Sequence, residues 1–105
     1  MDAKVNPSDI KHLEENSQRA SRLLRIMSNE KRLLILCNLV GQELSVQEIQ
    51  KATGLGQSTV SQQLAILRAE RLVKHRRQAQ SVYYGLDSPE AADILHTLHR
   101  NFCRK

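Results

Sequence analysis

The side chains best suited to covalent chemistry in this 105-residue chain are two cysteines, Cys37 and Cys103. Cys37 falls in the apolar run 33–37, where burial would make it an inert small hydrophobe. The residues around Cys103 are His99, one helical turn before it, and Arg100, Arg104 and Lys105. This basic setting favours the thiolate. Two interpretations stay open: two packed thiols, or a redox pair.

A second chemical feature is a run of hydrogen-bonding side chains without an acid, residues 57–64. At about 100° per residue, Val60, Leu64 and Leu67 share one helical stripe, and the polar side chains lie on or near the opposite side. Glutamine can bind adenine through two hydrogen bonds and serine can donate or accept, so this pattern predicts a recognition helix for the major groove of DNA. The predicted base contacts are Ser58, Ser61 and Gln62, and the predicted phosphate contacts near the helix start are Gln57 and Thr59.

Positive charge is concentrated directly after this run. The chain has a formal charge of +5, and residues 56–86 hold five basic side chains against Glu70 alone. This favours a polyanionic partner over a merely solvated charged face. Arg76, Arg77 and Gln80 are predicted to contact phosphate or the minor groove of double-stranded DNA.

A rival site uses Asp93, His96 and His99, which follow each other at every third position. Two such sets brought together in a dimer could bind zinc. Solvated polar residues beside the apolar stripe of Ile94, Leu95 and Leu98 are the commoner explanation. No cofactor or resident metal is therefore expected.

The pattern of caps and apolar positions predicts the elements that hold these residues. Asn6-Pro7 starts a helix over about 7–27, and Ser28-Asn29 starts a core helix over 30–40. A capping box at Ser45 and Glu48, a turn at 53–56 and the polar helix make a helix-turn-helix over about 45–71. Alternating residues over about 73–86 predict a two-strand hairpin, the wing, whose tip near 78–80 lacks an Asn-Gly turn and is expected to exceed two residues. Ser88-Pro89 starts a last helix over about 89–103.

The predicted fold class is therefore mainly α with a small β-hairpin, a winged helix-turn-helix in one domain over 1–105. The outer helices, 7–27 and 89–103, have more apolar surface than such a core needs. A symmetric homodimer is the simplest use for it. Two recognition helices about one DNA turn apart would then read an inverted-repeat operator.

The chain shows no signal for secretion or membrane insertion. Residues 1–9 contain no apolar core and include Asp2 and Asp9, and the longest apolar run, 33–37, is far too short to cross a bilayer. A cytoplasmic protein without a membrane partner is expected. In a reducing cytosol a permanent structural disulfide is disfavoured.

The order of elements resembles the ArsR/SmtB family of dimeric winged-helix repressors. The segments that carry the resemblance are Leu44 to Ile49, Leu55 to Leu64, Leu67-Arg68, Leu72-Val73 and Tyr83-Tyr84. Gln63 stands where the family's recognition helix commonly has histidine, in Ser-x-His-Leu. Cys37-Asn38-Leu39 lacks the second cysteine of the metal-thiolate sensors.

Met27 to Leu33, Ile35-Leu36-Cys37 and Cys103 resemble instead the BigR, SqrR and HlyU-type subgroup. That resemblance implies that Cys37 and Cys103 react with persulfides or oxidants and become bridged, which changes DNA affinity. The expected function is a sequence-specific transcriptional repressor that dissociates from DNA when these cysteines are modified.

Four other functions compete with this expectation. A zinc-responsive repressor would use Asp93, His96 and His99, and a DNA-binding anti-repressor would displace another regulator. An architectural DNA binder would sense nothing. A thiol peroxidase using Cys103 would need a helix N-terminus at the cysteine and further catalytic groups, which the sequence lacks, so no enzyme is expected.

Overall fold

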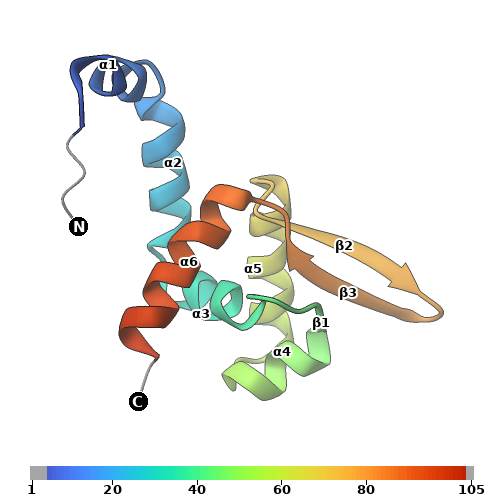
Figure 1. Ribbon diagram of the computed structural model, residues 1–105. Helices are drawn as coiled ribbons and strands as arrows, with labels where there is room; N and C mark the ends of the chain where they lie inside the picture. Colours follow the sequence, from blue (N-terminus) through green and yellow to red (C-terminus); the bar gives the residue numbers. More distant parts are fainter. Residues whose placement is uncertain (1–4, 104–105) are drawn as a thin grey trace.

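A computed structural model describes residues 5–103 as six helices and three short strands (Figure 1). In chain order the elements are α1 (Pro7–Glu15), α2 (Ser17–Met27), α3 (Glu30–Asn38), β1 (Leu44–Ser45), α4 (Val46–Thr53), α5 (Gln57–Ala69), β2 (Val73–Gln78), β3 (Ser81–Leu86) and α6 (Pro89–Phe102). The predicted fold class, mainly α with a small β-hairpin, is confirmed. Asp2, Arg104 and Lys105 lie outside the described residues.

One apolar cluster joins the central elements, since α3 packs on α4, α5 and α6. Its buried side chains are Met27, Ile35, Leu36, Leu39, Ile49, Val60, Leu64, Leu67, Leu72, Val73, Ala91 and Leu95. Among the described residues no polar or charged side chain is buried in it. The orientation of α5 inside this cluster is therefore set by apolar packing, which is non-directional, and by polar contacts at its rim.

The helices α1, α3 and α6 begin where the caps predict. The Asn6 side chain accepts a hydrogen bond from the Asp9 N–H at 3.0 Å, and Asn29 accepts one from the Arg32 N–H at 3.0 Å. Ser88 caps α6 by accepting from the Ala91 N–H at 3.1 Å. Each cap satisfies a backbone donor that the first turn of a helix leaves without a partner.

The predicted helix over 7–27 is divided at Asn16, which corrects the sequence prediction. The Asn16 N–H and its Nδ2 both donate to the His12 carbonyl, at 3.1 and 2.9 Å, and the Ser17 hydroxyl donates to the Glu14 carbonyl at 3.1 Å. These contacts satisfy the last carbonyl groups of α1, so the helix ends there. The chain turns sharply before α2 (Figure 1).

The wing is part of a three-stranded sheet, with the order β1-β3-β2. The strand β1 was not predicted, and it pairs antiparallel with β3 through Leu44 opposite Tyr84. The predicted longer loop is also wrong, because Gln78 pairs with Ser81 and leaves only Ala79 and Gln80 in the turn. Ala79 has a φ of 55°, so an alanine takes the positive-φ position that usually requires glycine.

Arg71 occupies a second position that favours glycine, and its replacement gives a stability prediction. The Leu72 N–H donates to the Leu67 carbonyl at 2.9 Å and closes the end of α5, which places Arg71 at a φ of 63°. Removing the side chain relieves backbone strain of about 1 kcal/mol. Glycine also has more freedom in the unfolded chain, which offsets part of this gain, so Arg71→Gly is expected to raise the free energy of unfolding by about 0.5 kcal/mol in urea denaturation.

Gly54 supplies the matched control. Its φ is 76°, and a Cβ added there would meet no heavy atom within 4 Å, so Gly54→Ala tests backbone strain alone. This variant is expected to lose about 1 kcal/mol. A loss of stability in both variants would contradict the strain at Arg71.

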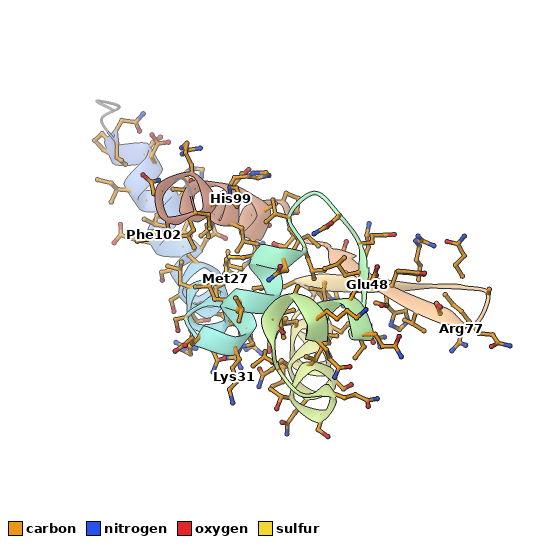
Figure 2. The ribbon with its side chains drawn as sticks, turned by 90° about the horizontal axis from the view of Figure 1, so that it is seen from below. Met27, Lys31, Glu48, Arg77, His99 and Phe102 are labelled. Atoms are coloured by element: carbon orange, nitrogen blue, oxygen red, sulfur yellow. The ribbon has the colours of Figure 1, made fainter. Side chains whose placement is uncertain are left out.

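Large apolar side chains remain exposed only on the outer part of the molecule, within the described residues. They are Val5, Ile10, Leu13, Leu24, Leu34 and Phe102, from α1, α2, α3, α6 and the segment before α1. Figure 2 places Phe102 at the opposite end of the molecule from Arg77 in the wing. None of the helices in residues 5–103 has the length and hydrophobicity needed to cross a bilayer.

Candidate DNA interface and cysteine pair

The helix-turn-helix consists of α4, a short turn and α5. The Ser45 hydroxyl accepts from the Glu48 N–H at 3.2 Å, and the Glu48 carboxylate accepts from the Ser45 N–H at 2.9 Å, so the predicted capping box is present. Gly54, in the left-handed region, ends α4. The Leu55 N–H then donates to the Thr53 hydroxyl at 3.2 Å, which fixes the turn into α5.

The helix α5 has the two faces that its sequence predicts. Val60, Leu64 and Leu67 are buried. The polar side chains Gln57, Ser58, Ser61 and Gln62 are exposed, and Thr59 is half-buried. The surface that α5 turns to solvent is therefore lined by small and flexible hydrogen-bonding groups, which can follow the edges of bases.

Arg76 in the wing is held by three neighbours. Its Nε donates to the Glu43 carboxylate at 2.6 Å and its Nη1 donates to the Gln78 side-chain oxygen at 2.6 Å. Its guanidinium also lies 5.1 Å from the centroid of the Tyr83 ring. The sequence predicts that Arg76 contacts phosphate or the minor groove, but it gives no sign of Glu43, which belongs to no motif and meets Arg76 only through the fold.

Gly85 makes room for Glu43. A Cβ at Gly85 would lie 3.1 Å from the Glu43 Cγ, closer than nearly all real contacts of this kind. The Glu43 side chain thus lies across β3 to reach Arg76 on β2. A carboxylate held there opposes the approach of DNA phosphate and pairs with Arg76, one of the positive groups that would attract it.

The charge of Glu43 gives a second prediction. Glu43→Gln releases Arg76 and removes one negative charge, so affinity for any duplex is expected to rise several-fold at low salt. The slope of log affinity against log salt should steepen by about 0.9, the value of one phosphate contact. Fluorescence anisotropy over a salt series measures both. Glu14→Gln, the same change on α1, is the control, and equal slopes in the two variants would contradict the role given to Glu43.

The other wing residues predicted to contact DNA are exposed. Arg77 and Gln80 lie near the tip of the hairpin, and Figure 2 shows Arg77 pointing away from the body of the molecule. Tyr84 packs against the core, and its ring stands edge-on to the His75 ring with 5.9 Å between the two ring centroids. Because Tyr83 lies beneath Arg76 and Tyr84 supports the sheet, both tyrosines stabilise the wing.

The two cysteines belong to elements that pack on each other, since Cys37 lies on α3 and Cys103 directly follows α6. Cys37 is half-buried on α3, and Cys103 is exposed directly after α6, where its N–H donates to the His99 carbonyl at 3.0 Å. Burial raises the pKa of the Cys37 thiol above its usual value, and the charge of the nearby Cys103 raises it further. Both thiols are free. Of the predicted basic neighbours of Cys103, Arg104 and Lys105 lie outside the described residues.

The three residues of the rival zinc site do not form a metal site within one chain. Asp93, His96 and His99 are all exposed on α6. Over residues 5–103, no three side chains of His, Cys, Asp or Glu gather closely enough to hold a metal ion. A zinc site at these positions would need a second copy of the chain.

A helix-turn-helix with a polar second helix and a basic wing defines a winged-helix DNA-binding protein. Residues 29–75 match the model of the bacterial regulatory proteins of the arsR family. The chain is 45% identical over 98 residues to the transcriptional activator HlyU of Vibrio cholerae, covering 93% of this chain and 91% of that protein. The chain therefore belongs to the arsR family.

Two solved structures show how far this likeness extends. Reduced HlyU from Vibrio cholerae N16961 aligns with a TM-score of 0.84 and 46% identity over 90% of this chain and 99% of that one. The transcriptional repressor BigR from Xylella fastidiosa aligns with a TM-score of 0.83 and 35% identity over 90% and 97%. One of these relatives is named a transcriptional activator and the other a transcriptional repressor.

Proposed function

We propose that this arsR-family regulator binds an inverted-repeat operator as a homodimer and loses DNA affinity when Cys37 and Cys103 become linked. The observation that carries the proposal is that α3, which holds Cys37, packs on α6, which ends at Cys103, so that the charge of Cys103 raises the pKa of the Cys37 thiol. Ser58, Ser61 and Gln62 would contact bases, and Gln57, Thr59, Arg76, Arg77 and Gln80 would contact phosphate or the minor groove.

The exposed apolar side chains support the homodimer. All but Leu34, which lies on α3, belong to the outer helices or to the segment just before α1, and none lies on α5 or in the wing, among the residues described. Phe102 is 78% exposed and Leu13 is 59% exposed. Contact of these apolar side chains with water is unfavourable, and burial against a second copy of the chain would remove it. A two-fold axis through this surface leaves both wings outward and sets the distance between the two recognition helices.

The proposed switch is a thiol exchange in two steps. The Cys103 thiolate attacks the outer sulfur of an organic persulfide, the sulfur–sulfur bond of that reagent breaks, and a thiolate leaves with the electron pair. Cys37 then loses its proton to solvent and attacks the Cys103 Sγ, and hydrosulfide leaves as the disulfide forms. The persulfide is the oxidant, and it ends as one thiol and one hydrogen sulfide.

The position of this link connects the chemistry to DNA binding. Leu34 and Phe102 are exposed apolar side chains of the proposed dimer surface. Cys37 lies three residues after Leu34, and Cys103 directly follows Phe102. A bond between the cysteines would pull the end of α6 toward α3 and reshape that surface. The separation of the two recognition helices would change, while the side chains of α5 would stay as they are.

Selection of duplexes from a random pool by the reduced protein tests DNA recognition. Enrichment of an inverted repeat whose half-sites are about one DNA turn apart, together with a dimer in sedimentation, is expected. Failure to enrich any sequence, or a monomer at micromolar concentration, would refute the proposal. DNase footprinting of the enriched duplex then locates both half-sites.

A second candidate function is anti-repression, in which the bound protein displaces another regulator. It is favoured by one observation, that a relative with 45% identity is named a transcriptional activator. In a purified transcription system, a repressor lowers transcription from the selected site by itself. An anti-repressor changes transcription only when a competing DNA-binding protein is present.

A further inference from the structure

Arg32 joins three elements at the edge of the core. It lies in the first turn of α3, next to the junction with α2 that Met27 and Lys31 mark in Figure 2. Its Nε donates to the Ile26 carbonyl in the last turn of α2 at 2.8 Å. Its Nη1 donates to the Gln63 side-chain oxygen in the middle of α5 at 3.2 Å. One half-buried guanidinium thus links an outer helix, the helix of Cys37 and α5.

The backbone of Arg32 fixes the direction in which its guanidinium group points. The Arg32 N–H is the group that Asn29 caps, which sets the start of α3. A guanidinium is planar and rigid, so its two bonds hold Ile26 and Gln63 in one plane. A lysine ammonium is a compact charge on a flexible stem, so it would not hold the two acceptors in a fixed relative position. The link therefore depends on the shape of arginine as well as on its charge.

Gln63 is well placed to pass this constraint to the DNA-facing side of α5. It stands between Gln62, which is exposed, and Leu64, which is buried. The N-terminus of α5 has no side-chain cap, and packing by Val60, Leu64 and Leu67 permits rotation better than a directional hydrogen bond does. A bond at Gln63 fixes the angle at which the neighbouring polar side chains face outward.

We propose that Arg32 is a positioning residue for sequence recognition, which holds α5 at a set orientation relative to α2 and α3. This inference rests on the proposed role of α5 as the helix that reads DNA. Arg32 acts through Gln63 and touches no base itself. Because α2 carries part of the proposed dimer surface and α3 carries Cys37, a shift of either helix reaches α5 through this contact.

The test is a double-mutant cycle of Arg32→Ala and Gln63→Ala, read as the ratio of affinities for the selected duplex and for a random duplex. Each single variant is expected to lower this ratio about tenfold, the typical effect of one hydrogen bond to a charged group. The double variant should be no worse than either single one, because both remove the same contact. Arg32→Lys should also bring the ratio of affinities for the selected and random duplexes close to that of Arg32→Ala.

The control is Arg22→Ala, which removes the same charge from another link between α2 and α5. Arg22 binds Glu70 after the end of α5 through two hydrogen bonds of 2.7 Å. That contact lies far along α5 from Gln62, so the affinity ratio is expected to stay unchanged. Urea denaturation of every variant shows whether it folds, and Gln63→Ala removes only a half-buried side chain.

Three results would overturn the role of Arg32. An equal loss for both duplexes would make it a stability or charge effect, and additive losses in the cycle would mean that Gln63 contacts DNA independently. If Arg32→Lys kept the affinity ratio of the wild type, a positive charge at this position would be enough for recognition and the shape of arginine would not matter. A wild-type protein that does not distinguish the two duplexes would instead refute the proposed function, so the two failures are separable.

Discussion

Replacing either Cys37 or Cys103 with serine is expected to abolish the release of DNA by polysulfide. The wild-type protein should gain one link within each subunit, seen by mass spectrometry of the intact chain and of its peptides. Affinity for the selected duplex should fall about tenfold or more in step with that link, which is within the usual range of allosteric coupling. Neither serine variant can form the link, so both should keep their DNA affinity.

The two serine variants should nevertheless differ in what they accumulate. Cys103 is exposed, so it reacts first, and in Cys37→Ser it should remain as a persulfide one sulfur atom heavier than the thiol. In Cys103→Ser the remaining Cys37 should stay unmodified at neutral pH. Burial raises its pKa, so little thiolate is present, and its modification should accelerate as pH rises.

The outcome that contradicts the switch is specific. If Cys37→Ser or Cys103→Ser still releases DNA after polysulfide treatment, the response does not need the pair. Ser21→Cys, which adds an exposed thiol on α2, is the matched control for non-specific modification. It should gain extra sulfur without any further loss of DNA affinity.

Removing both arginines of the wing is expected to weaken binding to every duplex. Arg76→Ala with Arg77→Ala should reduce the slope of log affinity against log salt by about 0.9 for each phosphate contact that is lost. Because Glu43 holds Arg76, Arg77→Ala alone should cost more affinity than Arg76→Ala alone. The two single variants and the double variant are compared by fluorescence anisotropy between low and moderate salt.

The control for the wing is Arg19→Ala with Arg25→Ala, which removes the same charge from α2. Its salt slope is expected to match the wild type, because phosphate contacts are local and distant charges are screened beyond about 10 Å at 0.1 M salt. Discrimination between the selected and random duplexes should survive in the wing variant. An unchanged salt slope in that variant would reject the wing as a DNA contact.

The parts of the fold that local rules govern could be predicted from the sequence. Asn29, the Ser45 and Glu48 box and Ser88 cap their helices because a helix start needs acceptors within three residues. The side chains of Val60, Leu64 and Leu67 are buried, as their spacing predicts. These features depend on neighbours along the chain, which a sequence shows directly.

The contacts missed were those between distant residues. Glu43 meets Arg76, and Arg32 meets Gln63, only after the sheet and the helices have packed. The strand β1 forms because β3 supplies its hydrogen-bonding partner. With only two residues it is too short to be recognised as a strand from the sequence. The end of α1 at Asn16 was missed because the apolar stripe resumes with Ala20 and Leu23, so the pattern suggested one helix.

The most direct test of the cysteine switch is one titration of a labelled selected duplex with three forms of the wild-type protein at fixed salt. The forms are reduced, peroxide-treated and polysulfide-treated, each with its modification verified by mass spectrometry. We expect the form linked through Cys37 and Cys103 to bind with a Kd at least tenfold higher than the reduced form. A fully linked protein that binds with the same Kd as the reduced protein would contradict the account.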